Sequence, residues 1–262
     1  MIEALRTLPF AMTAILNQGC RLEIYAPLPA GEPMQCTAQL VELQREPGKI
    51  KITTKITTST ESGGLACVAL VYAVIPQKAP RAEKKSAGAA LNARREPARV
   101  PAEADCVATH TLGRDSGRHY ACLSGDFNPI HWVPPAARAA GFPYCILHGF
   151  AQMALVQEDL VRNSAYAYTL LDVQPPGAGP VRVLDVRFVS PLVLPGTMSV
   201  HVALGDTTDS DSDSECTVHV ADEHGAVTLI GTFELASAKE VASLPPSSSS
   251  LHFADERERS RL

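Results

Sequence analysis

The stretch YACLSGDFNPIH, from Tyr120 to His131, decides how the rest of this sequence is interpreted. Gly125 and the pair Asn128–Pro129 favour turns, so a tight loop is expected here rather than a regular element. Asp126 and His131 lie five positions apart across this turn, close enough for both side chains to face one pocket. A carboxylate and an imidazole form a minimal general acid–base pair that can hold a water molecule between them.

A second feature lies downstream, in the run Ile146-Leu-His-Gly-Phe150, where the apolar spacing of a helix begins. A helix N-terminus offers free backbone N–H groups and the positive end of the helix dipole. A glycine such as Gly149 lets a carbonyl oxygen approach that backbone closely. Such a site can stabilise the enolate oxyanion that forms when a thioester is attacked at its β carbon.

Each of these residues also has a purely structural interpretation. Asp126 can cap a turn, Asn128 can form an Asx turn, and His148 can be an ordinary neighbour of a helix start. A metal site built from His131, Cys145 and His148 matches no zinc spacing, so no metal is expected.

The rest of the sequence predicts two segments that each combine one helix with several strands. In the first, apolar residues from Leu8 onward predict a helix that ends at Gly19, followed by strands at 21–25, 34–43, 49–58 and 65–75. In the second, strands are expected at 181–188, 197–204, 215–221 and 227–235, after a helix whose apolar face is Phe150, Met153, Ala154, Gln157, Leu160 and Val161. The alternation in these strands predicts antiparallel sheet in a duplicated α+β fold.

Two stretches have the composition of connecting or unstructured chain. Residues 77–99 are rich in Ala, Pro, Lys and Arg, and the tail from Leu244 is rich in Ser and Pro and then charged. The expected organisation is therefore an N-terminal half over 1–76, a linker over 77–100, a C-terminal half over 101–240, and a disordered tail over 241–262.

Composition and charge narrow the classes of function. Hydrophobic residues make up 45% of the chain and charged residues 19%, as in ordinary globular proteins. The net charge of −5 predicts no general attraction to nucleic acid or acidic membranes, and no apolar run reaches the ~18 residues of a membrane span. Seven cysteines without a paired framework, and no signal-peptide pattern, favour a cytoplasmic protein with reduced thiols. The final Ser260-Arg261-Leu262 resembles a Ser-Lys-Leu peroxisomal address, which leaves a peroxisomal location as the alternative.

The motif resembles the signature of MaoC-like (R)-specific enoyl-thioester hydratases and 3-hydroxyacyl-thioester dehydratases. The family pattern is an aromatic residue, an aliphatic and a small one, then Gly-Asp-x-Asn-Pro-aliphatic-His and a small residue further on. This chain fills those positions with Tyr120, Leu123, Ser124, Gly125, Asp126, Asn128, Pro129, Ile130, His131 and Ala137. The following Ala-Arg-Ala-Ala-Gly-Phe-Pro and His148-Gly149-Phe150 are similar to the family's second block.

This resemblance implies a double hot-dog fold, in which helices are wrapped by two antiparallel sheets joined into one and the N-terminal half lacks catalytic residues. It implies that Asp126 and His131 activate water, that Asn128 orients the loop, and that the Gly149 N–H polarises the thioester carbonyl. Substrate contacts are expected from Ser124, Gly125, Phe127, His148 and Phe150, and contacts to a carrier phosphate from Arg182 or Arg187. The chain departs from the family in beginning almost at its first helix and in carrying Val133 where many relatives have a polar residue.

The expected substrate is an acyl thioester linked to coenzyme A or to acyl carrier protein, with no separate cofactor and no nucleic-acid partner. Either a homodimer or a single double hot-dog monomer is expected. Two other functions remain open at this point: an acyl thioesterase on the same fold, and a non-catalytic subunit that binds acyl thioesters.

Overall fold

Nine antiparallel strands form one sheet in the part of the chain that the computed structural model describes, residues 15–26, 28, 31–77, 98–163, 181–203 and 216–235. Their order across the sheet is β2-β3-β4-β1-β6-β9-β8-β7-β5. The strands are β1 Leu16–Ile24, β2 Met34–Glu46, β3 Lys49–Thr60, β4 Leu65–Pro76, β5 Asp105–Leu112, β6 Val181–Phe188, β7 Gly196–Ala203, β8 Cys216–Asp222 and β9 Val227–Leu235. The helical segments are α3 Ser116–Ser124, the 3-10 turn η2 Pro129–His131, α4 Pro134–Ala139 and α5 Gly149–Arg162.

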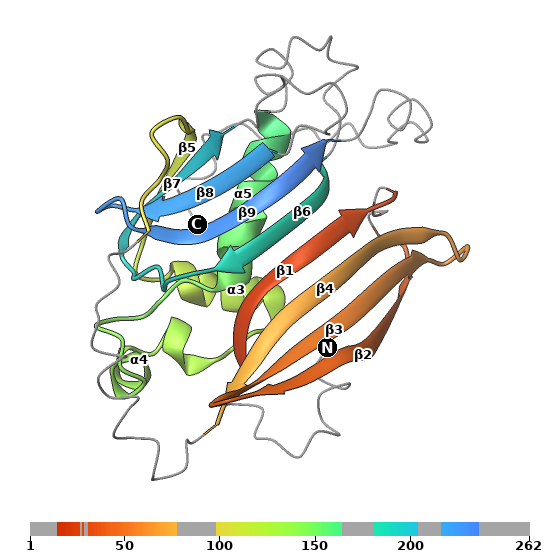
Figure 1. Cartoon of the computed structure of the whole chain (residues 1–262), viewed down its shortest axis with the longest axis horizontal. Coiled ribbons are helices and arrows are strands. Elements are labelled where there is room, and N and C mark those ends of the chain that lie inside the picture. Colours follow the sequence, from red (N-terminus) through yellow and green to blue (C-terminus); the bar gives the residue numbers. More distant parts are fainter. Residues whose placement is uncertain are drawn as a thin grey trace.

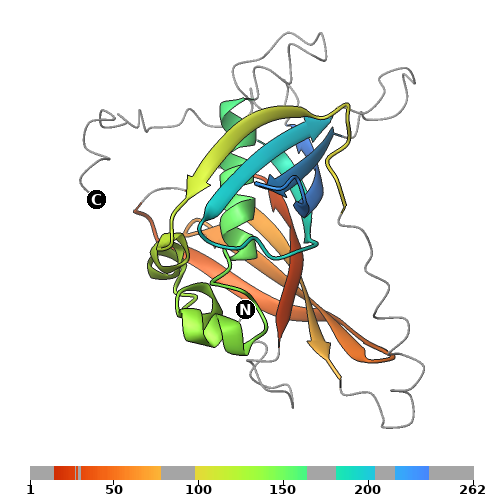
Figure 2. The ribbon, with the colours of Figure 1, turned by 90° about the vertical axis from the view of Figure 1, so that its left-hand side faces the viewer.

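The N-terminal and C-terminal strands meet where β1 pairs with β6. Arg21 lies opposite Asp185 in this pairing, and β1 pairs with β4 along its other edge. The sheet curves around α5, which lies along its inner face and contacts both β1 and β6 (Figures 1 and 2). The two small helices α3 and α4 lie together at one end of the molecule (Figure 1). A helix wrapped by antiparallel strands confirms the predicted α+β class.

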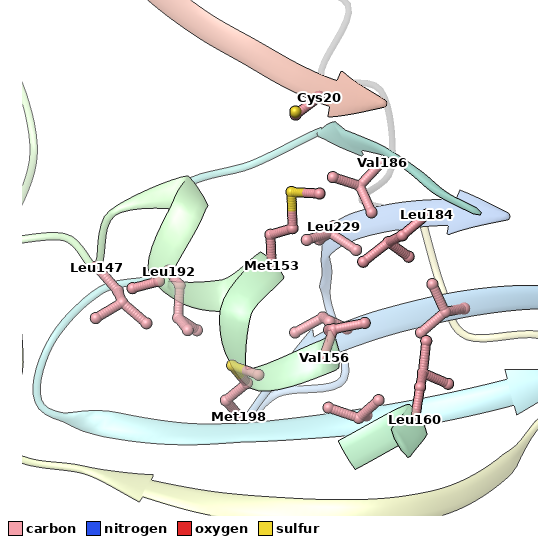
Figure 3. Packing of buried hydrophobic residues seen from close by; sticks show 14 of the residues in the cluster. Cys20, Leu147, Met153, Val156, Leu160, Leu184, Val186, Leu192, Met198 and Leu229 are labelled. Atoms are coloured by element: carbon pink, nitrogen blue, oxygen red, sulfur yellow. The ribbon is translucent and has the colours of Figure 1, made fainter. Parts of the chain in front are cut away.

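The main core lies between α5 and the inner face of the sheet (Figure 3). Alternate side chains of the C-terminal strands point into it, as the sequence predicted. Its buried members from α5 and the strands include Met153, Val156, Leu160, Leu184, Val186, Met198 and Leu229. Each such side chain contributes ~1.5–3 kcal/mol on burial, so this cluster fixes α5 on the sheet.

Gly19 marks an irregularity in β1 rather than the end of a helix. Its φ is 152°, and the register of β1 on β4 shifts between Asn17 and Gly19. A Cβ here would lie 2.1 Å from the carbonyl oxygen of Val186, so glycine allows β6 to approach β1 closely. The predicted helix end is therefore wrong, because Leu16 to Gly19 form strand. The earlier part of that helix, up to residue 14, lies outside the described residues.

The other predicted strands are confirmed within a few residues, and β6 and β9 have the predicted bounds. The predicted apolar face of α5 is wrong in part, because Ala154 and Val161 are exposed while Gln152 and Val156 are buried. Packing of α5 against the sheet selects the buried residues, which are Ala151, Gln152, Met153, Val156, Asp159 and Leu160.

Strand β5 was not predicted. It lies at an edge of the sheet, and Leu112 is its one fully buried residue. His110 on β5 contacts the buried carboxylate of Asp159 near the end of α5, with 2.7 Å between Nε2 and Oδ2. This contact ties the edge strand to the helix that it covers.

The predicted domain boundaries stay a prediction. Residues 78–97, within the expected linker, and the expected tail lie outside the described residues, whereas Arg99 already bridges to Ala226 beside β9. Among the described helices, none has the length and apolar character needed to cross a membrane.

Candidate active site

The motif from Tyr120 to His131 begins in the last residues of α3 and continues into a loop. The predicted loop over 120–131 is wrong in part, because Tyr120 to Ser124 form the end of this helix. The helix ends at Gly125, whose φ of 75° is the left-handed conformation common at helix C-termini. Ser124 Oγ donates to the Tyr120 carbonyl at 2.8 Å and accepts the Asp126 N–H at 3.2 Å. These bonds join the helix to the loop that follows.

The loop itself is shaped by hydrogen bonds between near neighbours. Asp126 Oδ1 accepts the N–H of Asn128 at 3.2 Å, and Asn128 Oδ1 accepts the N–H of Ile130 at 3.4 Å, where η2 begins. The Asn128 side chain thus caps the start of η2, and its predicted role in orienting the catalytic loop stays a prediction. The Asp126 side chain is 54% exposed, so a ligand can reach its carboxylate.

His131 ends η2 and is buried with a fixed ring orientation. Its Nδ1 lies 2.8 Å from the carbonyl oxygen of Ile146, which assigns the proton to Nδ1 because a carbonyl can only accept. Nε2 therefore carries the lone pair. Burial, and then the nearby ring of His148, lower the pKa of His131 to about 4. The ring is neutral at physiological pH and can accept a proton at Nε2.

His148 lies directly against His131. The two rings are stacked with centroids 3.6 Å apart and an angle of 23° between their planes. Nε2 of His148 donates to the carbonyl oxygen of Asp126 at 3.0 Å. Burial lowers the pKa of His148 as well, so two neutral imidazoles lie side by side. The ring of Tyr120 also packs against His148, with 4.9 Å between the two ring centroids.

α5 begins at Gly149, so its first N–H groups, which have no partner inside the helix, lie beside the Asp126 loop. A Cβ at Gly149 would lie 2.6–2.8 Å from ring atoms of Phe188. Glycine therefore allows β6 to pack against the helix start. Phe150 meets the same Phe188 ring edge to face, with centroids 6.0 Å apart.

The polar groups of the site converge on one point. Ligating atoms of Asp126, His131 and His148 all lie within 4.8 Å of one another. Hydrogen bonds of ~2.8 Å to one shared water molecule can bridge groups that lie this close together. The arrangement can therefore hold a water molecule, and the expectation of no metal stays a prediction.

An apolar hollow of about 290 Å³ lies beside the start of α5. Phe150 and Met153 of α5 form one wall. The other wall comes from the N-terminal strands β1, β3 and β4, through Cys20, Leu22, Ile56, Ala69 and Val71. The hollow therefore combines side chains from both halves of the chain at the start of the helix that follows His148.

The structure does not bring Arg182 and Arg187 to this site. Arg187 pairs with Asp185 and lies over the ring of Tyr72, 3.8 Å from its centroid. Arg182 pairs with Glu234 at 3.1 Å. Both acidic partners alternate along their strands with residues that face α5, so these pairs lie on the opposite face of the sheet. Their predicted contact with a carrier phosphate remains a prediction.

The comparison with protein families agrees with this geometry. Residues 95–225, half of the 262-residue chain, match the family model described as MaoC like domain. This chain belongs to the MaoC-like dehydratase family.

Two characterised relatives align with the MaoC-like region. The 3-hydroxyacyl-thioester dehydratase X of Mycobacterium tuberculosis is 38% identical over 89 residues, which are 34% of this chain and 27% of the relative. The peroxisomal hydratase-dehydrogenase-epimerase of Saccharomyces cerevisiae is 32% identical over 123 residues, 47% of this chain and 12% of the relative. The alignments thus span less than a third of either relative.

Solved structures show the fold of this MaoC-like chain. HtdX of Mycobacterium tuberculosis is 22% identical with a TM-score of 0.61, over 89% of this chain and 82% of that one. A second Mycobacterium tuberculosis protein, which has a double hot-dog fold, is 14% identical with a TM-score of 0.53, over 86% and 76% of the two chains. The implied double hot-dog fold is confirmed.

Several residues of the MaoC-like site escaped the sequence analysis. Gly117 on α3 packs against the His131 carbonyl, and Trp132 donates its indole N–H to the Phe127 carbonyl at 3.2 Å. Phe188 contacts the start of α5 from β6. The sequence carries no local signal for these contacts, except that Gly117 inside a helix is unfavourable without a packing reason.

Proposed function

We propose that this chain catalyses the reversible addition of water to trans-2-enoyl thioesters, giving (3R)-hydroxyacyl thioesters in fatty acid metabolism. The observation that carries the proposal is the convergence of the Asp126 carboxylate and the neutral His131 beside the start of α5. The family contains named hydratases and dehydratases, so hydro-lyase activity is the expected chemistry.

In the proposed hydration, one water molecule lies between Asp126 and His131. Its oxygen bonds to the β carbon of the enoyl thioester while its proton passes to the Asp126 carboxylate. His131 Nε2 accepts a hydrogen bond from the same water, because its Nδ1–H is committed to the Ile146 carbonyl. Fixing both groups before the reaction removes much of the entropic cost of aligning the water.

The electrons of the double bond move onto the thioester oxygen, which becomes an enolate. The N–H of Gly149, at the N-terminus of α5, is placed to stabilise this charge. The enolate then collapses and its α carbon takes up the proton held by the Asp126–His131 pair, so no proton is gained or lost overall. Dehydration follows the same steps in reverse.

The apolar hollow supports a fatty acyl chain as the rest of the substrate. Phe150 and Met153 lie one and four positions after Gly149, so a thioester bound at the helix start directs its chain between α5 and the N-terminal strands. Ser124, Gly125, Phe127, His148 and Phe150 remain the proposed substrate-binding residues. Coenzyme A or acyl carrier protein enters as part of the substrate, and no further cofactor is proposed.

The cellular setting is proposed from the sequence. A cytoplasmic location is the first proposal. A peroxisomal location is the alternative, because Ser260-Arg261-Leu262 resembles a peroxisomal address and one relative is a peroxisomal enzyme. This tripeptide lies outside the described residues. Pairing of β1 with β6 within one chain supports a double hot-dog monomer as the smallest unit, with a homodimer of such chains as the alternative.

The test is to mix the purified protein with crotonyl-CoA and follow the loss of enoyl-thioester absorbance. Asp126→Asn and His131→Ala are each expected to lower kcat/KM by ~10²–10⁴-fold, because each removes one member of the acid–base pair. Asp115→Asn and His119→Ala, exposed residues at and near the start of α3, are the matched controls and should retain full activity. Chiral chromatography of the product tests the (3R) configuration.

The outcomes separate the alternative functions. Wild-type protein that is inert with short, medium and long enoyl thioesters on either carrier would rule out the hydratase. Release of free thiol from a saturated acyl thioester would then indicate a thioesterase, and binding without turnover would indicate a non-catalytic subunit.

A further inference from the structure

His148 contacts both His131 and the Asp126 loop, and it lies at the start of α5. It is 2% exposed and immediately precedes Gly149. Its ring stacks on His131 at 3.6 Å, and its Nε2–H donates to the Asp126 carbonyl at 3.0 Å. It therefore links the acid–base loop to the helix N-terminus that is proposed to bind the thioester oxygen.

This link differs from the other hydrogen bonds of the loop. Those made by Ser124, Asp126 and Asn128 join residues two to four positions apart, so they shape the loop and join it to the end of α3 without linking it to α5. The bond from His148 joins residues 22 positions apart. Among the hydrogen bonds of the described residues to Asp126, it is the one that fixes the loop relative to α5.

The other ring nitrogen of His148 adds no hydrogen bond of its own within the described part of the chain. Nδ1 is buried and has no hydrogen-bond partner among the described residues. A buried acceptor left without a partner costs ~1–3 kcal/mol. An apolar side chain of similar size, packed between Tyr120 and His131, would avoid this cost, so the advantage of the histidine lies in its Nε2–H.

We infer that His148 is a positioning residue for the proposed hydration, holding the Asp126 loop at the start of α5 through its Nε2–H and supporting the His131 ring by stacking. This inference rests on the proposed function and goes beyond the expected role of His148 in binding substrate. It predicts that His148 acts on the rate of the reaction more than on the affinity for the thioester.

The test compares His148→Leu, which removes the donor, with His148→Gln, whose side-chain N–H can donate again. The leucine variant is expected to lose roughly 10–100-fold in kcat, as when groups that orient a reacting residue are removed, with KM for crotonyl-CoA within about threefold of wild type. The glutamine variant should recover part of that loss. The melting temperature of the leucine variant should equal or exceed that of wild type, because the unpartnered nitrogen is gone.

Amide hydrogen exchange of residues 125–130 supplies a measurement that is independent of turnover. Exchange should be roughly tenfold faster in His148→Leu and close to wild type in His148→Gln. His119→Leu, an exposed histidine on α3, is the matched control and should change neither activity nor exchange.

Two results would overturn the inference: loop exchange unchanged in the leucine variant, or kcat falling only in parallel with a fall in melting temperature. Wild-type protein inert on all enoyl thioesters would defeat the proposed function instead. The exchange comparison would then still decide whether His148 positions the loop.

Discussion

The packing of α3 against His131 predicts an unusual effect for Gly117→Ala. In a helix, alanine is normally more favourable than glycine by ~0.5–1 kcal/mol, so the substitution alone should stabilise α3. Here the new Cβ would lie 2.0 Å from the carbonyl oxygen of His131, whereas real Cβ atoms stay beyond 3.0 Å. Either the helix or His131 must therefore move by about 1 Å. We expect a loss of ~1–3 kcal/mol in stability, as in other overpacked sites.

The same displacement moves His131, one member of the proposed acid–base pair, relative to the substrate. A misplacement of about 1 Å can cost ~10²-fold in rate, so kcat/KM for hydration of crotonyl-CoA should fall by about that factor. Gly113→Ala is the control, since a Cβ there meets no atom within 4 Å. Activity is followed by enoyl-thioester absorbance and stability by urea denaturation. Wild-type stability and rate in Gly117→Ala would refute the described contact between α3 and His131.

Two further predictions concern the pH dependence and the acyl chain. The pKa of His131 is about 4 in the folded protein, below the ordinary 6.5. Between these two pH values the unfolded chain binds a proton at His131 and the folded protein does not. The free energy of unfolding therefore decreases as the pH drops from 6.5 toward 4. His131 contributes about 3 kcal/mol to that decrease. Urea denaturation at pH 7 and pH 4.5 should show that the stability of His131→Gln depends less on pH than the stability of wild type. An equal pH dependence of the two proteins would contradict the prediction. Ala69→Phe fills the apolar hollow, so kcat/KM for decenoyl-CoA should fall roughly tenfold relative to crotonyl-CoA, and an equal fall for both would show that the acyl chain binds elsewhere.

The sequence alone predicted the strands in which buried and exposed residues alternate strongly. β3 and β7 bury alternate residues, as at Ile50 and Ile52 or Met198 and Val200, and this pattern is visible without a structure. It failed for β5, where an edge position leaves a single fully buried residue and hence no pattern. It failed at Gly19 because a glycine that ends a helix and one that permits close strand approach look alike in sequence.

The candidate site likewise contains features that the sequence could predict and features that it could not. Asp126, Asn128 and His131 act through a short loop, and their local arrangement follows from turn-forming neighbours. The bond from His148 to the Asp126 carbonyl depends on how α5 packs after η2 and α4, which no local pattern encodes. The hollow depends on the pairing of β1 with β6, and the placement of Arg187 depends on which face of β6 turns toward α5. The packing of the whole sheet determines these long-range contacts and orientations.

The hollow draws its walls from two separate stretches of chain, with consequences for how this protein can diverge. Leu22, Ile56 and Ala69 lie far ahead of Asp126 and His131 in sequence and contact neither member of the acid–base pair in the described hydrogen-bond network. Under the proposed function, substitutions at these three residues are expected to change which acyl chain binds while Asp126 and His131 stay in place. The joined sheet thus places the N-terminal residues that line the hollow and the proposed acid–base pair in different parts of the sequence, so substitutions can alter one without the other.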